Sequence, residues 1–190
     1  MFGINYKNVV VSGDSAGGNL AIAVTVMAIK RGFRKPDALK PCYPSTIISP
    51  DAFWPSILCA LDDPILSQGL LAIIQGSVTP TGAQKFIGTK NLYMSPGLHA
   101  PDEILKQFPP TIITLAGIDP LKDDGLFFLN RLIQLDVKAR GVEFHLMPHG
   151  YLNFDFPFNK GMRESKIAIN KTGEFLKELI EQLNSVEHTY

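Results

Sequence analysis

Ser15 has the sequence neighbours of an enzymatic nucleophile. It is the central residue of Gly13-Asp14-Ser15-Ala16-Gly17, which fits the pattern G-x-S-x-G. The apolar run Val9 to Val11 precedes this pentapeptide, and good helix formers follow it from Ala16 to Lys30. In a sharp turn from strand to helix, the residues two positions either side of the serine crowd each other, so glycine fits there. The pattern therefore predicts a Ser15 hydroxyl exposed at the carboxyl end of a sheet, with the Ala16 amide facing a developing oxyanion.

Two other interpretations of the glycine-rich segment stay open. It could be a structural turn that caps the helix through Asp14 or Ser15, or a loop that cradles a phosphate. The phosphate loop has less support, because the segment lacks the Lys-Ser/Thr ending of a P-loop. A nucleotide-binding protein would also leave the acid and the base described next without a role.

A serine nucleophile needs a base, and the base needs a carboxylate that orients it. Asp119 follows the apolar run Thr111 to Leu115, and His149 follows the alternating run Val142 to Met147. The stretch between them is long enough for one helix and one strand, so both side chains can reach the sheet edge of Ser15. We therefore predict Ser15, Asp119 and His149 as catalytic residues.

The predicted acid and base have structural alternatives and competitors. Asp119 could cap a helix that has Pro120 in its first position, and His149 could be an exposed turn residue. Asp123 and Asp124 are competing carboxylates, but their place in the first helical turn favours an interaction with the helix dipole. Three other histidines fit less well by position, since they lie in a strand, a proline-rich segment and the tail: His145, His99 and His188.

Alternating strands and helices must position these residues. The first helix spans Ala16 to Lys30, with Gly32 placed to end it, and a second spans about Asp123 to Leu135. A last helix, about Met162 to Leu183, carries an apolar stripe opposite charged residues, as expected of a surface helix packed on a sheet. The stripe consists of Ala168, Thr172, Phe175, Leu176, Leu179, Ile180 and Leu183.

The stretch from Pro41 to Pro110 has weaker periodicity and predicts less. Only two elements are predicted in this part of the chain. They are a strand near Leu39 to Cys42, which begins just before the stretch, and a helix near Ser67 to Gln75. Strands that alternate with helices place the chain in the α/β class, with a mostly parallel sheet flanked by helices. We expect residues 1–184 to form one domain and residues 185–190 to form a loose tail.

Composition excludes several classes of protein. Of the 190 residues, 45% are hydrophobic and 19% are charged, as in ordinary globular proteins. Lysine and arginine number 18, as do aspartate and glutamate, so a nucleic-acid partner is not expected. No stretch has the length and apolar character of a membrane span, and the first residues do not form a signal peptide. Cys42 and Cys59 lack metal or disulfide spacing and are expected to be buried reduced thiols, which indicates a cytoplasmic protein.

The three motifs together resemble those of the hormone-sensitive lipase family of α/β-hydrolases. The segment from Gly13 to Leu20 is similar to the nucleophile elbow G-D-S-A-G-G, and Asp119-Pro120-Leu121-Lys122-Asp123-Asp124 is similar to the family's acid motif. Pro148-His149-Gly150-Tyr151 resembles the base motif, commonly H-G-F, with Tyr in place of Phe. Residues 62–66 and 94–110 resemble the member that gave the family its name.

The resemblance, which extends from about Asn8 to Ile180, implies a carboxylic ester hydrolase. Ser15 would attack the ester carbonyl, His149 would take and return a proton, and Asp119 would hold His149 in the right tautomer. The Ala16 amide would bind the oxyanion. The resemblance further implies a small-molecule or lipid acyl ester as substrate, a role in lipid metabolism, and no cofactor or metal. Contact with a lipid surface and the oligomeric state stay open.

One feature of the family is missing from the sequence. The family has an H-G-G-G loop upstream of the nucleophile that completes the oxyanion hole, and its fold places the serine after the fifth of eight strands. Only fourteen residues precede Ser15, so we expect an N-terminally truncated fold that keeps the last four strands. The run Val9 to Val11 would then be an unpaired sheet edge. An inactive remnant or a binding module is the alternative to an active esterase.

Overall fold

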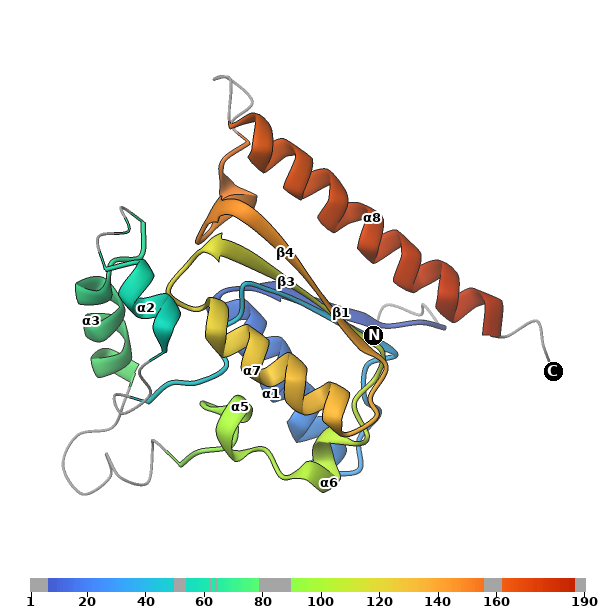
Figure 1. The fold of residues 1–190 in the computed structure, drawn as a ribbon. Helices are drawn as coiled ribbons and strands as arrows, with labels where there is room; N and C mark the ends of the chain where they lie inside the picture. The colour runs from blue at the N-terminus through green and yellow to red at the C-terminus, as the bar shows by residue number, and fades with distance from the viewer. Residues whose placement is uncertain are drawn as a thin grey trace, which may run out of the picture.

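A computed structural model describes six parts of the chain: residues 7–49, 54–61, 63, 65–78, 90–155 and 162–186. Four strands form one sheet in which every neighbouring pair is parallel. In their order across the sheet they are β1 (Val10–Asp14), β2 (Ala38–Cys42), β3 (Thr111–Ile118) and β4 (Ala139–Pro148). Their carboxyl ends therefore lie along one edge (Figure 1), and the predicted α/β class with a parallel sheet is confirmed.

β1 is an edge strand, as expected. Among the residues that the structure describes, it pairs with β2 alone. It begins one residue later than the run Val9 to Val11 and continues to Asp14, directly before Ser15. The pairing with β2 therefore extends to the last residue before the predicted nucleophile.

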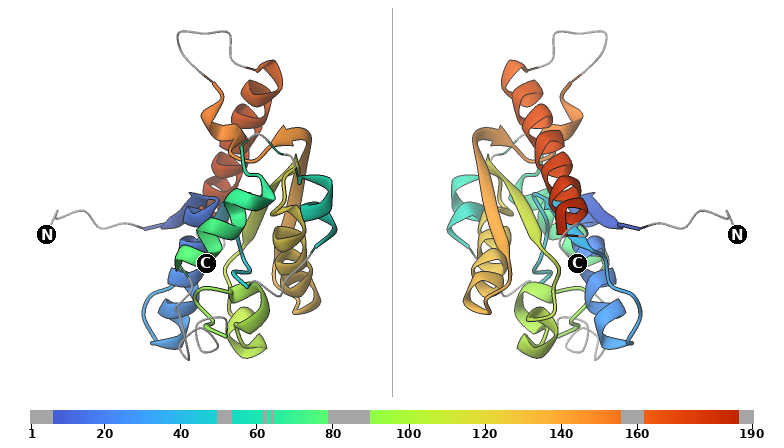
Figure 2. Two further views of the ribbon diagram at one scale, coloured as in Figure 1. Left: turned by 90° about the vertical axis from the view of Figure 1, so that its left-hand side faces the viewer. Right: turned by 90° about the vertical axis from the view of Figure 1, so that its right-hand side faces the viewer.

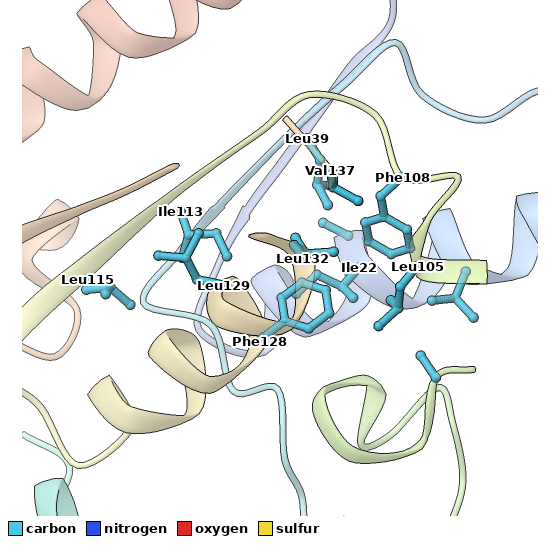
Figure 3. Close-up of a cluster of buried hydrophobic side chains, with 13 residues drawn as sticks. Ile22, Leu39, Leu105, Phe108, Ile113, Leu115, Phe128, Leu129, Leu132 and Val137 are labelled. Atoms are coloured by element: carbon cyan, nitrogen blue, oxygen red, sulfur yellow. The ribbon is translucent and has the colours of Figure 1, made fainter. Parts of the chain in front are cut away.

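Helices cover both faces of the sheet (Figure 1, Figure 2). α1 (Ala16–Lys30) and α7 (Lys122–Gln134) lie on one face, and α8 (Arg163–Val186) lies on the other. Between α1, α7 and the sheet, buried side chains form a continuous apolar core, which Figure 3 shows in close-up. In this core Phe128 is fully buried and meets Phe108 edge to face, with ring centroids 5.9 Å apart.

α1 has the bounds that the sequence predicts, and Gly32 ends it. Gly32 adopts a left-handed φ of 65°. The amide of Phe33 then donates to the carbonyl oxygen of Ala28 at 2.8 Å, across the end of the helix. This is the usual way in which a glycine satisfies the last carbonyl groups of a helix.

The middle of the chain contains more helix than the sequence indicated. The helix expected near Ser67 to Gln75 is α3 (Gln68–Val78). Four short elements were not predicted. Three lie in the middle of the chain, α2 (Pro55–Cys59), α5 (Pro96–His99) and α6 (Asp102–Leu105), and the fourth, the 3-10 turn η1 (Tyr151–Asn153), follows β4. Each is about one turn long, which is too short to show a helical period.

α8 is longer than the predicted helix. It ends at Val186 and so enters the segment 185–190 that we expected to be a tail, of which residues 187–190 lie outside the described residues. Its stripe meets the sheet through Ala168, Thr172 and Leu179, which are buried. Ile180, expected on the same stripe, is 41% exposed.

A bulge in β4 changes which side chains face the interior. The register of β4 against β3 shifts between Ala116 and Ile118. Strict alternation would place Leu146 on the same face as Val142 and Phe144, inside the fold, but it is 63% exposed and Met147 is buried in its place. The strict alternation predicted for Val142 to Met147 is therefore wrong at this point, because a bulge moves the residues that follow it to the other face.

Gly117 allows β3 and β4 to approach each other at this bulge. A Cβ atom on Gly117 would lie 2.0 Å from the carbonyl oxygen of His145. Backbone atoms of a paired strand cannot move away from such a contact without opening the pairing, so only glycine fits. The bulge thus depends on one residue of the neighbouring strand.

Two carboxylates of α7 hold the connection that follows β2. The Asp124 carboxylate accepts a hydrogen bond from the Ile47 amide at 3.2 Å, and the Thr46 hydroxyl donates to the Asp124 carbonyl oxygen at 2.8 Å. The Asp123 carboxylate accepts one from the Ser56 amide at 2.8 Å. Burial raises the pKa of the Asp124 carboxyl well above its usual value, and the hydrogen bond from Ile47 offsets part of this rise.

Both cysteines are free, but only Cys42 is buried. Cys59 is the last residue of the short helix α2 and is exposed, so the expectation of two buried thiols is wrong for this residue. Within the described ranges, no helix has the length and apolar composition needed to cross a membrane. In the same ranges, no group of three or more His, Cys, Asp or Glu side chains could hold a metal ion.

Replacing Gly117 by alanine should destabilise the protein. The new methyl group would overlap the backbone of His145, and overpacking of this kind costs about 1–3 kcal/mol or more. Gly173 in α8 is the matched control, because a Cβ atom there has no neighbour within 4 Å. Alanine at position 173 should stabilise the helix by up to about 1 kcal/mol. Urea denaturation measures both, and equal midpoints for the two variants would contradict the steric constraint.

The raised pKa of Asp124 should make stability depend on pH. The folded protein keeps this proton at pH values where the unfolded chain has lost it, so the group lowers the free energy of unfolding as the pH rises above 3.8. Asp124→Asn keeps an acceptor for the Ile47 amide and removes the titration. We expect the variant to gain stability relative to the wild type progressively as the pH rises above 3.8. Urea denaturation across this range tests it, and a constant difference would count against the shift.

Candidate active site

The backbone of Ser15 has a conformation that residues with a side chain rarely adopt. Its φ is 54° and its ψ is −117°, in the sharp turn between β1 and α1. The Ser15 amide donates to the carbonyl oxygen of Cys42 at 2.9 Å, which ties the turn to β2. Ser15 thus stands at the carboxyl end of the sheet, and it is partly exposed.

The glycines of this turn are not equivalent. A Cβ atom on Gly13 would lie 2.3 Å from the carbonyl oxygen of Gly17, so the expected crowding is present there. A Cβ atom on Gly17 would meet no atom closer than 3.8 Å, so the expectation that glycine is needed on both sides is wrong for Gly17. Gly18 is constrained instead, because a Cβ atom there would lie 2.8 Å from the Cβ of Pro44.

His149 lies between the other two predicted catalytic residues and makes a hydrogen bond with each. Its Nδ1 is 2.8 Å from Oδ2 of Asp119, and its Nε2 is 2.8 Å from Oγ of Ser15. The Asp119 side chain is fully buried and that of His149 is 10% exposed. Water therefore weakens the interaction of the carboxylate with the imidazole very little.

The second carboxylate oxygen of Asp119 also has a partner. Oδ1 accepts a hydrogen bond from the Leu121 amide at 2.7 Å. Asp119 thereby holds the turn that enters α7, although the N-cap of this helix is Leu121. The structural and the catalytic interpretation of Asp119 are compatible, because each uses a different oxygen.

Gly150 directs the chain away from His149. Its φ of 74° is in the left-handed region, where glycine has no steric penalty. The chain turns there from β4 into η1, so that His149 faces Ser15 while Tyr151 enters the core beneath α8. The β4 bulge and this glycine together set the position of the imidazole.

The Ala16 amide, which the sequence predicts as an oxyanion donor, lies at the start of α1. Ala16 is the first residue of α1, so its amide has no acceptor within the helix. The amide lies at the positive end of the helix dipole and next to the predicted nucleophile in sequence. Such an amide can stabilise negative charge that develops on a substrate oxygen.

The competing carboxylates and histidines have other surroundings. The carboxylates of Asp123 and Asp124 bind the connection after β2, as described above. His145 is 88% exposed on β4, His99 is the last residue of α5, and His188 lies outside the described residues. The hydrogen bonds to Ser15 and Asp119 come from His149.

Sequence reasoning missed Tyr43. This buried residue follows β2, and its ring meets the His149 ring with centroids 5.1 Å apart and planes at 66°. Its hydroxyl donates to the Asp14 carboxylate at 3.2 Å. Tyr43 could have been found from its position in the sequence. It directly follows the predicted strand Leu39 to Cys42, at the sheet edge where the other site residues were expected.

Known proteins resemble this chain over most of its length. A family model described as the alpha/beta hydrolase fold matches residues 1–153. An esterase of Gibberella moniliformis is 30% identical over 148 residues, which are 76% of this chain and 44% of that protein. Human hormone-sensitive lipase is 39% identical over 72 residues, which are 38% of this chain and 7% of that protein.

Solved structures agree with these matches. Carboxyl esterase 2 of the fungus Tuber melanosporum has a TM-score of 0.79 at 27% identity, and the match covers 93% of this chain and 55% of that one. An esterase of Pyrobaculum calidifontis has a TM-score of 0.75 at 27% identity, with 89% and 52% covered. The chain spans about half the length of the esterases that it matches. It belongs to the alpha/beta hydrolase fold family, as the three motifs indicated, and its relatives include hormone-sensitive lipase and esterases of fungi and bacteria.

Proposed function

We propose that this chain carries the catalytic residues of a carboxylic ester hydrolase, a serine carboxylesterase or lipase. The proposal rests on the two hydrogen bonds of His149, at 2.8 Å to Ser15 and 2.8 Å to Asp119. A base held between a nucleophile and a carboxylate is what acyl transfer through a serine requires. The relatives named as esterases support the same class of reaction.

In the first half of the reaction, Oγ of Ser15 attacks the ester carbonyl carbon while Nε2 of His149 takes its proton. The imidazolium keeps its Nδ1 proton and donates it in a hydrogen bond to the Asp119 carboxylate, which stabilises the positive charge. The Ala16 amide donates a hydrogen bond to the oxyanion. His149 then gives its proton to the leaving alcohol, and Ser15 is left acylated.

In the second half, water replaces the alcohol. His149 removes a proton from the water, whose oxygen attacks the acyl carbon, and the proton then returns to Oγ of Ser15 as the carboxylic acid leaves. Asp119 keeps the Nδ1 proton of His149 in place throughout, since the Leu121 amide donates a hydrogen bond of 2.7 Å to Oδ1 of Asp119 and so anchors the carboxylate. These steps use protein groups and water alone.

We also propose that the substrates are acyl esters of small molecules or of lipids. We further propose that the protein acts in lipid metabolism in the cytoplasm. The match to human hormone-sensitive lipase supports the lipid assignment. The two free cysteines support a reducing compartment. An inactive remnant or binding module would keep the same side-chain geometry without turnover, and the next experiment separates the two.

Ser15→Ala should abolish covalent labelling by a fluorophosphonate, which reacts with activated serines. The wild-type chain should gain one adduct, measured by intact-mass spectrometry, because in the proposed reaction Nε2 of His149, 2.8 Å from Oγ, removes the Ser15 proton. Ser12→Ala is the matched control, since this serine of β1 donates to the carbonyl oxygen of Lys40 at 2.8 Å. The control should label at the wild-type rate. Unchanged labelling of Ser15→Ala would exclude Ser15, and a folded wild-type chain that does not label would favour the inactive remnant.

Asp119→Asn should lower kcat for a short p-nitrophenyl ester by about 10⁴-fold. Asparagine keeps the shape and can still accept from Leu121, but its amide would favour the wrong tautomer of His149. Asp123→Asn is the matched control, because Asp123 binds the Ser56 amide at 2.8 Å and should affect stability more than kcat. A loss smaller than about ten-fold in a folded Asp119→Asn protein would show that Asp119 does not orient the base.

A further inference from the structure

Two hydrogen bonds hold His149, and they leave one motion of its ring free. Nδ1 and Nε2 are each 2.8 Å from their partners on Asp119 and Ser15. A ring held at two atoms can still tilt about the line that joins them. Hydrogen bonds weaken as the geometry departs from linear, so the residue that packs on the ring determines how well both bonds stay aligned.

Tyr43 packs on this ring. The two rings meet edge to face, with centroids 5.1 Å apart and planes at 66°, an arrangement that aromatic pairs prefer. The Tyr43 ring also contacts that of Tyr151, with centroids 4.9 Å apart. The Tyr151 hydroxyl in turn donates to Oγ1 of Thr114 on β3 at 3.0 Å. The Tyr43 ring therefore packs between His149, the predicted base, and Tyr151, which is bound to β3 in the middle of the sheet.

The backbone of Tyr43 is strained in this position. Its φ of 34° lies in the left-handed region, which bulky residues rarely adopt. Its amide donates to the carbonyl oxygen of Thr114 at 2.6 Å, which holds the conformation. A glycine would adopt the same conformation without strain. Strain of this kind at a site points to a function for the side chain that is present.

Asp14 holds the far end of the Tyr43 ring. The Tyr43 hydroxyl donates to Oδ2 of Asp14, the last residue of β1, at 3.2 Å. Burial, followed by the charge of Asp14, raises the pKa of the Tyr43 hydroxyl, which therefore stays protonated and remains a donor. Side-chain contacts thus run from the turn of the nucleophile, through Tyr43, to the ring of the base.

We propose that Tyr43 is a positioning residue that fixes the tilt of the His149 ring, and that Asp14 acts on His149 through the Tyr43 hydroxyl. The inference rests on the proposed function, because it concerns how the base of that reaction is held. It assigns a role to the second residue of the G-x-S-x-G pattern and to the residue that follows β2.

The first test reads His149 directly and needs no activity. In protein labelled with ¹⁵N-histidine, the ring nitrogen shifts show which nitrogen carries the proton, and His149→Ala identifies the signals among those of the 4 histidines. In the wild type we expect His149 to hold its proton at Nδ1, where Asp119 accepts it at 2.8 Å. In Tyr43→Leu the shifts should move toward those of a freely exchanging imidazole. Identical His149 shifts in the two proteins would overturn the inference, whether or not the chain hydrolyses esters.

The second test measures kcat and KM for a p-nitrophenyl ester. Tyr43→Phe and Asp14→Ala each remove the same hydrogen bond, so each should lower kcat about five-fold with KM unchanged. The double variant should be no slower than either single variant. Asp14→Asn keeps an acceptor oxygen and should restore most of the loss. Tyr43→Leu also removes the ring and should cost on the order of 10²-fold.

Thr172→Val separates positioning from stability. Thr172 of α8 shares a hydrogen bond of 3.2 Å with the Tyr151 hydroxyl, so its loss should destabilise the same aromatic cluster from the other side. Its kcat should equal that of the wild type. A kcat that falls with stability in Thr172→Val as it does in Tyr43→Phe would reduce Tyr43 to a structural role. A wild-type chain without turnover or labelling would contradict the proposed function, and the histidine shifts would still decide the role of Tyr43.

Discussion

The edge of the sheet where Ser15, His149 and Asp119 meet depends on the strained backbone of Ser15. Its φ of 54° and ψ of −117° would relax in an isolated turn. Two features prevent this: the Ser15 amide binds the carbonyl oxygen of Cys42, and Gly13 lets the first turn of α1 approach the end of β1 within contact distance. The parallel pairing of β1 with β2, which runs to Asp14 and Cys42, resists the same relaxation. The sheet thus maintains the strain that exposes the hydroxyl.

β2 supplies none of the predicted catalytic residues, yet it connects the elements that do. Its last residue binds the amide of Ser15, and the next residue, Tyr43, binds β3 through its amide and meets His149 through its ring. The connection that follows is tied to α7 by Asp124, close in sequence to Asp119. The segment that follows β2 shows little hydrophobic periodicity, because contacts with three neighbouring elements set its conformation. A strand that contains none of the predicted catalytic residues can therefore control the geometry of Ser15, Asp119 and His149.

The features that could be predicted from the sequence are those that depend on residues close together in the chain. The turn at Ser15 and the helix from Ala16 to Lys30 follow from glycine spacing and helix propensity, so their positions were predicted closely. The β4 bulge depends on the approach of Gly117 to His145, two residues on different strands, and no local pattern encodes it. For the same reason strict alternation would place Leu146 inside. Tyr43 was missed because nothing in the sequence marks an aromatic residue as the partner of a histidine more than a hundred positions later.

The two halves of the chemistry place different demands on the fold. The proposed proton transfer requires Ser15, His149 and Asp119 at fixed distances. The groups that fix them belong to β2 and to the connections that follow β2 and β3: the Cys42 carbonyl, Tyr43 and the Leu121 amide. Oxyanion binding requires several amides aimed at one point, and the Ala16 amide is the one that the nucleophile turn itself provides. Removing one such donor costs about 10²–10³-fold in turnover, whereas removing the carboxylate that orients the base costs about 10⁴-fold. The residues that hold the proposed base therefore meet the more stringent of the two demands, and the hydrogen bond between His149 and Asp119 is both buried and short, at 2.8 Å.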